Sequence, residues 1–168
     1  MPRKPAAAAA IRLLILDVDG VLTDGRLYFG PRGEALKVFH VRDGHGIRAL
    51  IRAGIEVAII SGRRSRAVTA RCRELGIARV TQGAADKLAA FERLRRRVKV
   101  AAGACACIGD DLPDVPLFGV VGLAFAVADA HPAARRAAHH VTARPGGKGA
   151  VREVCERLLA ARERSAAR

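Results

Sequence analysis

Six of the nine aspartates in this 168-residue chain lie in two short clusters, each directly after an apolar segment. They are Asp17, Asp19 and Asp24 after residues 11–16, and Asp110, Asp111 and Asp114 after residues 105–108. Carboxylates this close together repel one another unless a cation lies among them. A few hard oxygen ligands are what Mg²⁺ prefers. In a chain of formal net charge +14, this clustering indicates a magnesium site.

A third polar segment, residues 61–63 (Ser-Gly-Arg), follows the apolar residues 57–60. With it, the chain holds the groups that phosphoryl transfer through a carboxylate requires. Asp17 can attack phosphorus as a nucleophile. Asp19, two residues on, can protonate the leaving oxygen and then activate water. The Ser61 hydroxyl, a lysine and backbone N–H groups would hold the phosphoryl oxygens.

The elements that must bring these segments together alternate between strand and helix. Short continuous apolar runs predict strands that are buried on both faces. Strands are expected at residues 11–16, 56–61, 79–81, 105–108, 123–128 and 139–142, and helices at 43–53, 64–75, 84–97, 114–121, after 131 and at 150–162. This alternation predicts an α/β fold with a three-layer, doubly wound parallel sheet. The carboxyl ends of its strands share one edge, where ligands bind.

The chain is expected to form one domain over residues 11–162. Within it, residues 26–40 alternate around Gly-Pro-Arg-Gly, which predicts a projecting β-hairpin, and no segment is long enough for a cap domain. Residues 1–10 are expected to be a disordered tail, and residues 163–168 a polar C-terminal tail.

Composition excludes several classes of protein. The 25 arginines and five lysines are spread along the chain, and five Phe, one Tyr and no Trp leave little for base stacking, so no nucleic-acid partner is expected. No apolar run reaches the roughly 18 residues of a membrane span, so no membrane partner is expected either. Four cysteines without CxxC spacing predict reduced thiols in a cytoplasmic protein.

Four motifs, in chain order, resemble those of the haloacid dehalogenase superfamily of aspartyl-phosphate phosphatases. They are DVDGVLTDG from Asp17, SGR from Ser61, Lys87 after QGAAD, and GDDLPD from Gly109. Further segments (VFHVRDGHGIRAL, CRELGI, VADAHP and GGKGAVREVCE) are similar to a small capless subgroup that dephosphorylates 3-deoxy-D-manno-octulosonate 8-phosphate, a lipopolysaccharide precursor. The resemblance implies a Rossmann-like, Mg²⁺-dependent phosphatase without a cap.

The resemblance also implies roles for individual residues. Asp17 would be the nucleophile and Asp19 the acid and base. The metal ligands would be Asp17, the Asp19 carbonyl and Asp110, supported by Asp111 and Asp114. Ser61 and Lys87 would hold the phosphate. The sugar-acid pocket would be formed by Asp19 and Lys87 together with His40, Val41, Arg42, Asp43, Gly44, Arg48, Arg63 and Arg71.

Three alternatives remain open from the residues. A receiver-type domain would accept phosphate without turnover, although its acidic pair would be adjacent rather than separated by one residue. A basic binding module would be indifferent to changes at Asp17. A sister phosphatase for a nonulosonate 9-phosphate usually has Glu after the Ser-Gly pair, whereas Arg63 stands here and suits a substrate carboxylate.

The hairpin also predicts an assembly. Two apolar strands in a lone hairpin would be marginally stable and would expose an apolar face. Burial against copies of itself in a closed oligomer solves this problem. The resembled subgroup implies a homotetramer with active sites at subunit interfaces, closed with the help of the Gly-rich segment 146–149.

Overall fold

A computed structural model describes residues 6–167, and its centre is a six-stranded parallel sheet. The strand order is β5-β4-β1-β6-β7-β8. The strands are β1 (Leu13–Leu16), β4 (Glu56–Ser61), β5 (Arg79–Gln82), β6 (Cys105–Gly109), β7 (Leu123–Ala126) and β8 (His140–Val141). Strands β1, β6 and β7 are buried along their whole length, as continuous apolar runs predict. The expected doubly wound α/β fold is confirmed.

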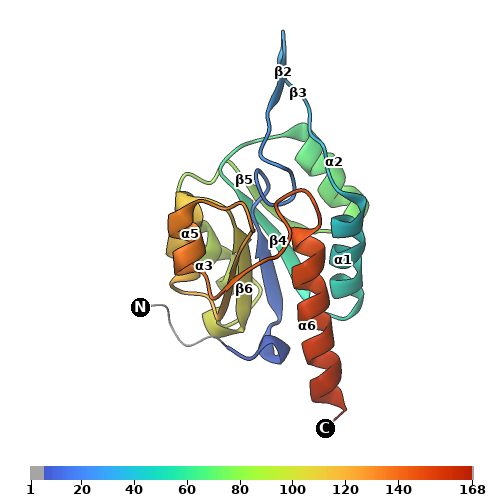
Figure 1. Cartoon of the computed structure of the whole chain (residues 1–168), viewed down its shortest axis with the longest axis vertical. Coiled ribbons are helices and arrows are strands. Elements are labelled where there is room, and N and C mark those ends of the chain that lie inside the picture. Colours follow the sequence, from blue (N-terminus) through green and yellow to red (C-terminus); the bar gives the residue numbers. More distant parts are fainter. Residues whose placement is uncertain (1–5, 168) are drawn as a thin grey trace.

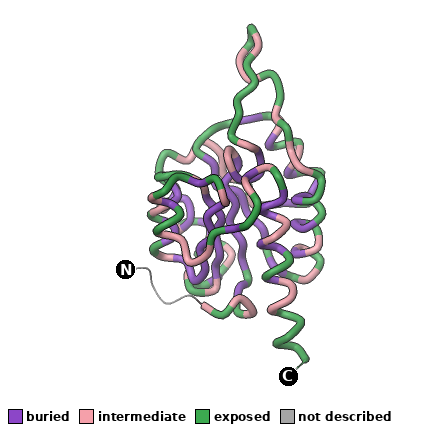
Figure 2. Tube along the Cα trace, in the orientation of Figure 1, coloured by how far each residue is buried: buried purple, intermediate pink, exposed green. Residues whose placement is uncertain are grey.

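Helices cover both faces of this sheet (Figure 1). They are α1 (Val41–Arg52), α2 (Arg66–Leu75), α3 (Lys87–Arg97), α4 (Val115–Phe118), α5 (Pro132–Ala137) and α6 (Ala150–Ala166), with 3₁₀ turns at Ala8–Ala10, Ala102–Ala104 and Leu112–Asp114. Helices α1 and α6 pack against each other on one face, while α3, α4 and α5 lie on the other. The buried residues form one continuous core between these layers (Figure 2).

The register of the central strands fixes where the polar segments meet. Leu16, the last residue of β1, pairs with Ile59 of β4 and with Ile108 of β6. The residues that follow these three strands therefore emerge at the same edge of the sheet. This edge is where the aspartate clusters were expected to converge.

The β2 (Tyr28–Gly30) and β3 (Gly33–Leu36) strands form an antiparallel hairpin. It projects from the rest of the chain, and within residues 6–167 no separate cap covers the strand ends (Figure 1). Its large apolar side chains are exposed: Phe29 is 64% exposed and Val38 is 56% exposed. The predicted hairpin is thus confirmed, and its apolar face is bare in a single chain.

The chain ends differ from what was expected. Helix α6 continues to Ala166 rather than stopping at residue 162, because residues 163–166 are helix formers with no Gly or Pro to end the helix. At the other end, residues 1–5 lie outside the described residues, but Ala6 donates from its N–H to Gly122 O and Ala8–Ala10 form a turn that contacts α6. The prediction of a disordered tail is therefore wrong for residues 6–10. Within the described part of the chain, no helix combines the length and hydropathy needed to span a bilayer.

Candidate active site

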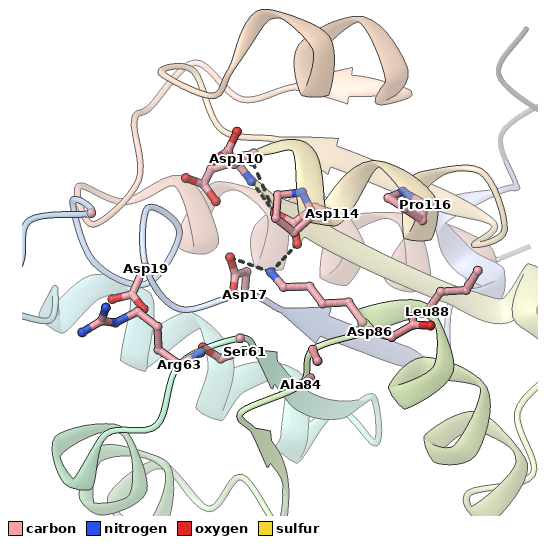
Figure 3. Close-up of a pocket in the computed structure, with 16 residues that line it drawn as sticks. Asp17, Asp19, Ser61, Arg63, Ala84, Asp86, Leu88, Asp110, Asp114 and Pro116 are labelled. Atoms are coloured by element: carbon pink, nitrogen blue, oxygen red, sulfur yellow. Dashed lines mark hydrogen bonds and ion pairs between the residues drawn. The ribbon is translucent and has the colours of Figure 1, made fainter.

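Asp17 lines a cavity of about 960 Å³ at the strand ends. Lys87 Nζ lies 2.9 Å from Asp17 Oδ2 and donates a 2.6 Å hydrogen bond to Asp114 Oδ1 (Figure 3). All three residues are buried. Lys87 is placed here because it is the first residue of α3, whose N-cap Asp86 accepts from Ala89 N. One buried ammonium thus bridges two buried carboxylates.

The electrostatics of this cluster follow from burial and like charge. Burial raises the pKa of Asp17, and the Asp114 carboxylate raises it further, against the opposing effect of Lys87. Burial also raises the pKa of Asp110, and Asp17 and Asp114 add to that rise. For Lys87, burial opposes the charged form, but the two carboxylates outweigh burial and raise its pKa. The site therefore holds more negative charge than its own lysine neutralises.

The geometry of the carboxylates fits a divalent cation. Asp17, Asp110 and Asp114 each place one oxygen within 4.8 Å of the others. Lys87 and two backbone N–H groups already engage Asp114. Among the described residues, none donates a hydrogen bond to the Asp110 side chain, whereas the Asp17 carboxylate pairs with Lys87 and accepts from the backbone N–H of Val18. These are hard oxygen donors of the kind Mg²⁺ prefers, so Asp17 and Asp110 are the side chains placed to ligate it.

Asp114 and Asp111 act on the loop after β6. Asp114 Oδ2 accepts from Asp110 N at 3.0 Å and from Asp111 N at 3.3 Å. The exposed Asp111 accepts from Leu112 N and caps the 3₁₀ turn at Leu112–Asp114. Both residues therefore shape the loop that presents Asp110, and their support of a metal ion stays a prediction.

The loop after Asp17 is held by close backbone contacts. Gly20 has a φ of +84°, and a Cβ there would lie 2.0 Å from Asp110 Oδ2. On its other side, a Cβ on Gly146 would lie 1.7 Å from Gly20 O, and Gly147 N donates to Val21 O at 2.9 Å. The glycine segment before α6 is therefore seated on the backbone of the Asp17 loop within the same chain.

The opposite wall of the cavity comes from the segment after β4. Ser61 is 3% exposed and lines the cavity, and its Oγ accepts from Arg63 N. The Arg63 side chain is 42% exposed and lies 3.7 Å from Asp19 Oδ2. Figure 3 shows Asp19 and Arg63 together, below Asp110 and to the left of Asp17. The Arg63 side chain thus lies beside the Asp19 carboxylate, apart from the pairing of Lys87 with Asp17 and Asp114.

Two polar residues of the hairpin, Lys37 and Glu34, were not predicted from the sequence. Lys37 Nζ donates a 2.5 Å hydrogen bond to Asp19 Oδ1 and lies 3.1 Å from Glu34 Oε2. Glu34 Oε1 accepts a hydrogen bond from Ser65 Oγ, at the N-cap of α2. The only sequence signal was a Glu and a Lys three residues apart, a spacing that solvated surfaces also show.

Seven residues expected in the sugar-acid pocket do not line this cavity in a single chain. They are His40, Val41, Arg42, Asp43, Gly44, Arg48 and Arg71. His40 caps α1, Asp43 is buried and accepts from Arg152 N of α6, and Arg71 pairs with Glu74. In a single chain they lie away from the cavity, because α1 begins beyond the hairpin and its first turn packs on α6. Their role in a sugar-acid pocket stays a prediction.

Known proteins resemble this chain over nearly its whole length. A profile of the haloacid dehalogenase-like hydrolases matches residues 74–153. The 3-deoxy-D-manno-octulosonate 8-phosphate phosphatase KdsC of Escherichia coli K12 is 54% identical over 156 residues, which are 93% of this chain and 83% of that protein. The Yersinia pestis enzyme of the same name is 52% identical over 94% of this chain and 84% of its own length. This chain belongs to the haloacid dehalogenase superfamily.

Solved structures of superfamily members share the fold. The cobalt-bound deoxy-D-mannose-octulosonate 8-phosphate phosphatase of Haemophilus influenzae superimposes with a TM-score of 0.92 at 45% identity, covering 95% of this chain and 93% of that one. The Moraxella catarrhalis 3-deoxy-D-manno-octulosonate 8-phosphate phosphatase, in complex with magnesium, phosphate and KDO, gives 0.91 at 41% identity, covering 96% and 92%. The haloacid dehalogenase fold without a cap is thus confirmed for this hydrolase.

Proposed function

We propose that the protein is a Mg²⁺-dependent phosphatase that hydrolyses 3-deoxy-D-manno-octulosonate 8-phosphate to the free sugar acid and phosphate, in lipopolysaccharide precursor synthesis. The observation that carries the chemistry is the buried bridge from Asp17 through Lys87 to Asp114, with the Asp110 carboxylate beside it. The substrate follows from relatives that are more than half identical over nearly the whole chain.

The reaction proceeds in two displacements at phosphorus. Asp17 Oδ1 forms a bond to phosphorus while the bond to the sugar oxygen breaks, and Asp19 gives its proton to that oxygen. Water then attacks the aspartyl-phosphate, Asp19 takes the proton from this water, and phosphate and free Asp17 result. Bound Mg²⁺ supplies charge neutralisation at the phosphoryl oxygens. Lys87 orients the Asp17 carboxylate through Oδ2, and the Ser61 hydroxyl donates to a phosphoryl oxygen.

The direct test is phosphate release from a panel of sugar-acid phosphates, with Mg²⁺ and with EDTA. We expect multiple turnovers on the octulosonate 8-phosphate, slower release from a nonulosonate 9-phosphate, and none in EDTA. A receiver-type domain would instead take up one phosphate per chain and stop. A basic binding module would release none.

Arg63 is expected to recognise the substrate carboxylate. It lines the cavity beside Asp19, and a guanidinium can bind a carboxylate through two N–H groups. Arg63→Ala should raise KM for the octulosonate phosphate by about 10–100-fold, the range for a lost charged hydrogen bond, and should affect a phosphate ester without a carboxylate much less. Equal effects on both substrates would remove Arg63 from carboxylate recognition.

We also propose a homotetramer in which neighbouring chains close each active site. The exposed side chains of Phe29 and Val38 give the hairpin an apolar face that a second copy would bury. A neighbouring copy is also what would bring the α1 residues from His40 to Gly44, together with Arg48 and Arg71, toward a substrate. Light scattering at working enzyme concentration should give four times the mass of one 17.8 kDa chain, and a fully active monomer would contradict the proposal.

We place this activity in the cytoplasm. The four cysteines are free and buried, which is the state expected in a reducing compartment.

A further inference from the structure

The hairpin reaches into the catalytic cluster of its own chain through one buried lysine. The Lys37 side chain is only 2% exposed and follows the last residue of β3. It lies between Asp19 and Glu34, with no place in the lining of the cavity. A buried ammonium that touches the acid and base residue but not the cavity acts on substrate only through that residue.

We propose that Lys37 is a positioning residue that sets which oxygen of Asp19 takes part in proton transfer. The inference rests on the proposed function and adds a residue outside the motif loops to it. An ammonium group is a donor with no acceptor. Asp19 Oδ1 accepts from it at 2.5 Å, so Oδ1 cannot itself donate a proton toward Lys37. The transferable proton is therefore confined to Oδ2, which lies beside Arg63 of the cavity lining.

Glu34 keeps Lys37 in this position. Glu34 Oε2 lies 3.1 Å from Lys37 Nζ, and Glu34 Oε1 accepts from Ser65 Oγ. Arg63 also approaches Glu34 at 3.9 Å and lies over the Phe29 ring at 5.9 Å. The base of the hairpin is thereby tied to the start of α2, so the Lys37 ammonium is held on both sides. General acid and base catalysis depends on such orientation, since the proton must lie within hydrogen-bond reach of the reacting oxygen.

Substrates with different leaving groups distinguish this positioning role of Lys37 from a role in anchoring the hairpin or in contacting the sugar. kcat/KM reports the steps up to formation of the aspartyl-phosphate, when Asp19 gives its proton to the leaving oxygen. An alkyl phosphate such as ethyl phosphate needs that proton, because alkoxide is a poor leaving group, whereas p-nitrophenyl phosphate hardly needs it. Neither ester carries the sugar acid, so neither depends on carboxylate recognition.

The experiment compares Lys37→Met with wild type on the octulosonate phosphate, ethyl phosphate and p-nitrophenyl phosphate, each with Mg²⁺. We expect kcat/KM to fall on the order of 100-fold for both alkyl esters, the lower range for general acid catalysis, and only slightly for the aryl ester. Lys37→Arg keeps a donor and should restore most of the loss. In a protein that already carries Asp19→Asn, adding Lys37→Met should lower kcat/KM little further. Arg26→Met, which removes an exposed hairpin cation paired with Asp24, is the matched control and should resemble wild type.

Two results would overturn the proposal. A uniform loss on all three substrates would mean that Lys37 only anchors the hairpin, and a loss confined to the octulosonate phosphate would mean that Lys37 contacts the sugar. If Lys37→Met does not fold by circular dichroism, Lys37→Arg and Glu34→Gln carry the same comparison. If the proposed function were wrong, the wild type itself would not hydrolyse the octulosonate phosphate, so this outcome is distinct from the two above.

Discussion

We expect Asp17→Asn to abolish turnover while the chain stays folded. An amide cannot form the acyl-phosphate, so kcat should fall by a factor on the order of 10⁴–10⁶, as when other covalent nucleophiles are removed. The fold should survive because Asn is nearly the same size and uncharged, in a place where burial already disfavours the charge of Asp17. Lys87 keeps its pairing with Asp114. Phosphate release measures the loss, and circular dichroism checks the fold.

Asp24→Asn is the matched control for this experiment. It is the same substitution in the same aspartate cluster, but Asp24 accepts from Arg26 N at the start of the hairpin and does not line the cavity. It should keep wild-type kcat. Acid-quenched wild type incubated with labelled substrate should carry phosphate on Asp17, and the Asn variant should carry none. Substantial turnover by Asp17→Asn would show that another residue is the nucleophile.

Asp110→Asn is expected to lose activity while making the metal-free protein more stable. Burial and two neighbouring carboxylates raise the pKa of Asp110 above that of an unfolded aspartate. A carboxyl group with a raised pKa in the folded state costs stability once pH exceeds its unfolded pKa, and the cost grows until the folded pKa is passed. At neutral pH the Asn variant lacks this cost. We expect a gain of about 1 kcal/mol, which raises Tm by roughly 2–4 °C in a chain of this size.

The same substitution should remove the response to metal. Mg²⁺ binds the folded wild type and raises its Tm as concentration rises, whereas Asp110→Asn should show little or no rise and no phosphate release. Melting curves in EDTA from pH 4 to pH 8 test the predicted gain in stability. Toward pH 8 the wild type should become less stable relative to Asp110→Asn. A metal-free variant less stable than wild type at pH 7, or one that is active in EDTA, would contradict the assignment of Asp110.

The sheet and the core of the site were predictable from the sequence because their signals are local. Residues 13–16 and 105–109 are apolar runs, and such runs form strands buried on both faces of a parallel sheet. Once the strands are parallel, their polar ends must meet at one edge. Asp17 and Asp110 therefore converge although they are distant in the chain, and the structure brings them together.

What the sequence could not predict depends on tertiary contacts without a local pattern. Lys37 and Glu34 look like ordinary hairpin charges, and only the fold of the hairpin onto α2 buries Lys37 against Asp19. Asp43 looked like a pocket residue, but its carboxylate accepts from Arg152 N because α1 packs on α6. Some helices also begin a few residues from where they were predicted. Helix α3 was expected from residue 84 but begins at Lys87, because the Asp86 side chain caps it there.

The seating of Gly146 and Gly147 on the loop after Asp17 has a consequence for synthesis of the chain. Asp17 leaves the ribosome before the rest of its site, because β4 and β6, which flank its strand, and the glycine segment that supports its loop all come later in the chain. A domain of this kind folds as a unit once its parts are present. A nascent chain therefore exposes its carboxylates without a formed site, and it gains hydrolytic activity only after the glycine segment has been made. Chains cut short before α6 would be inactive even though they contain all four motifs.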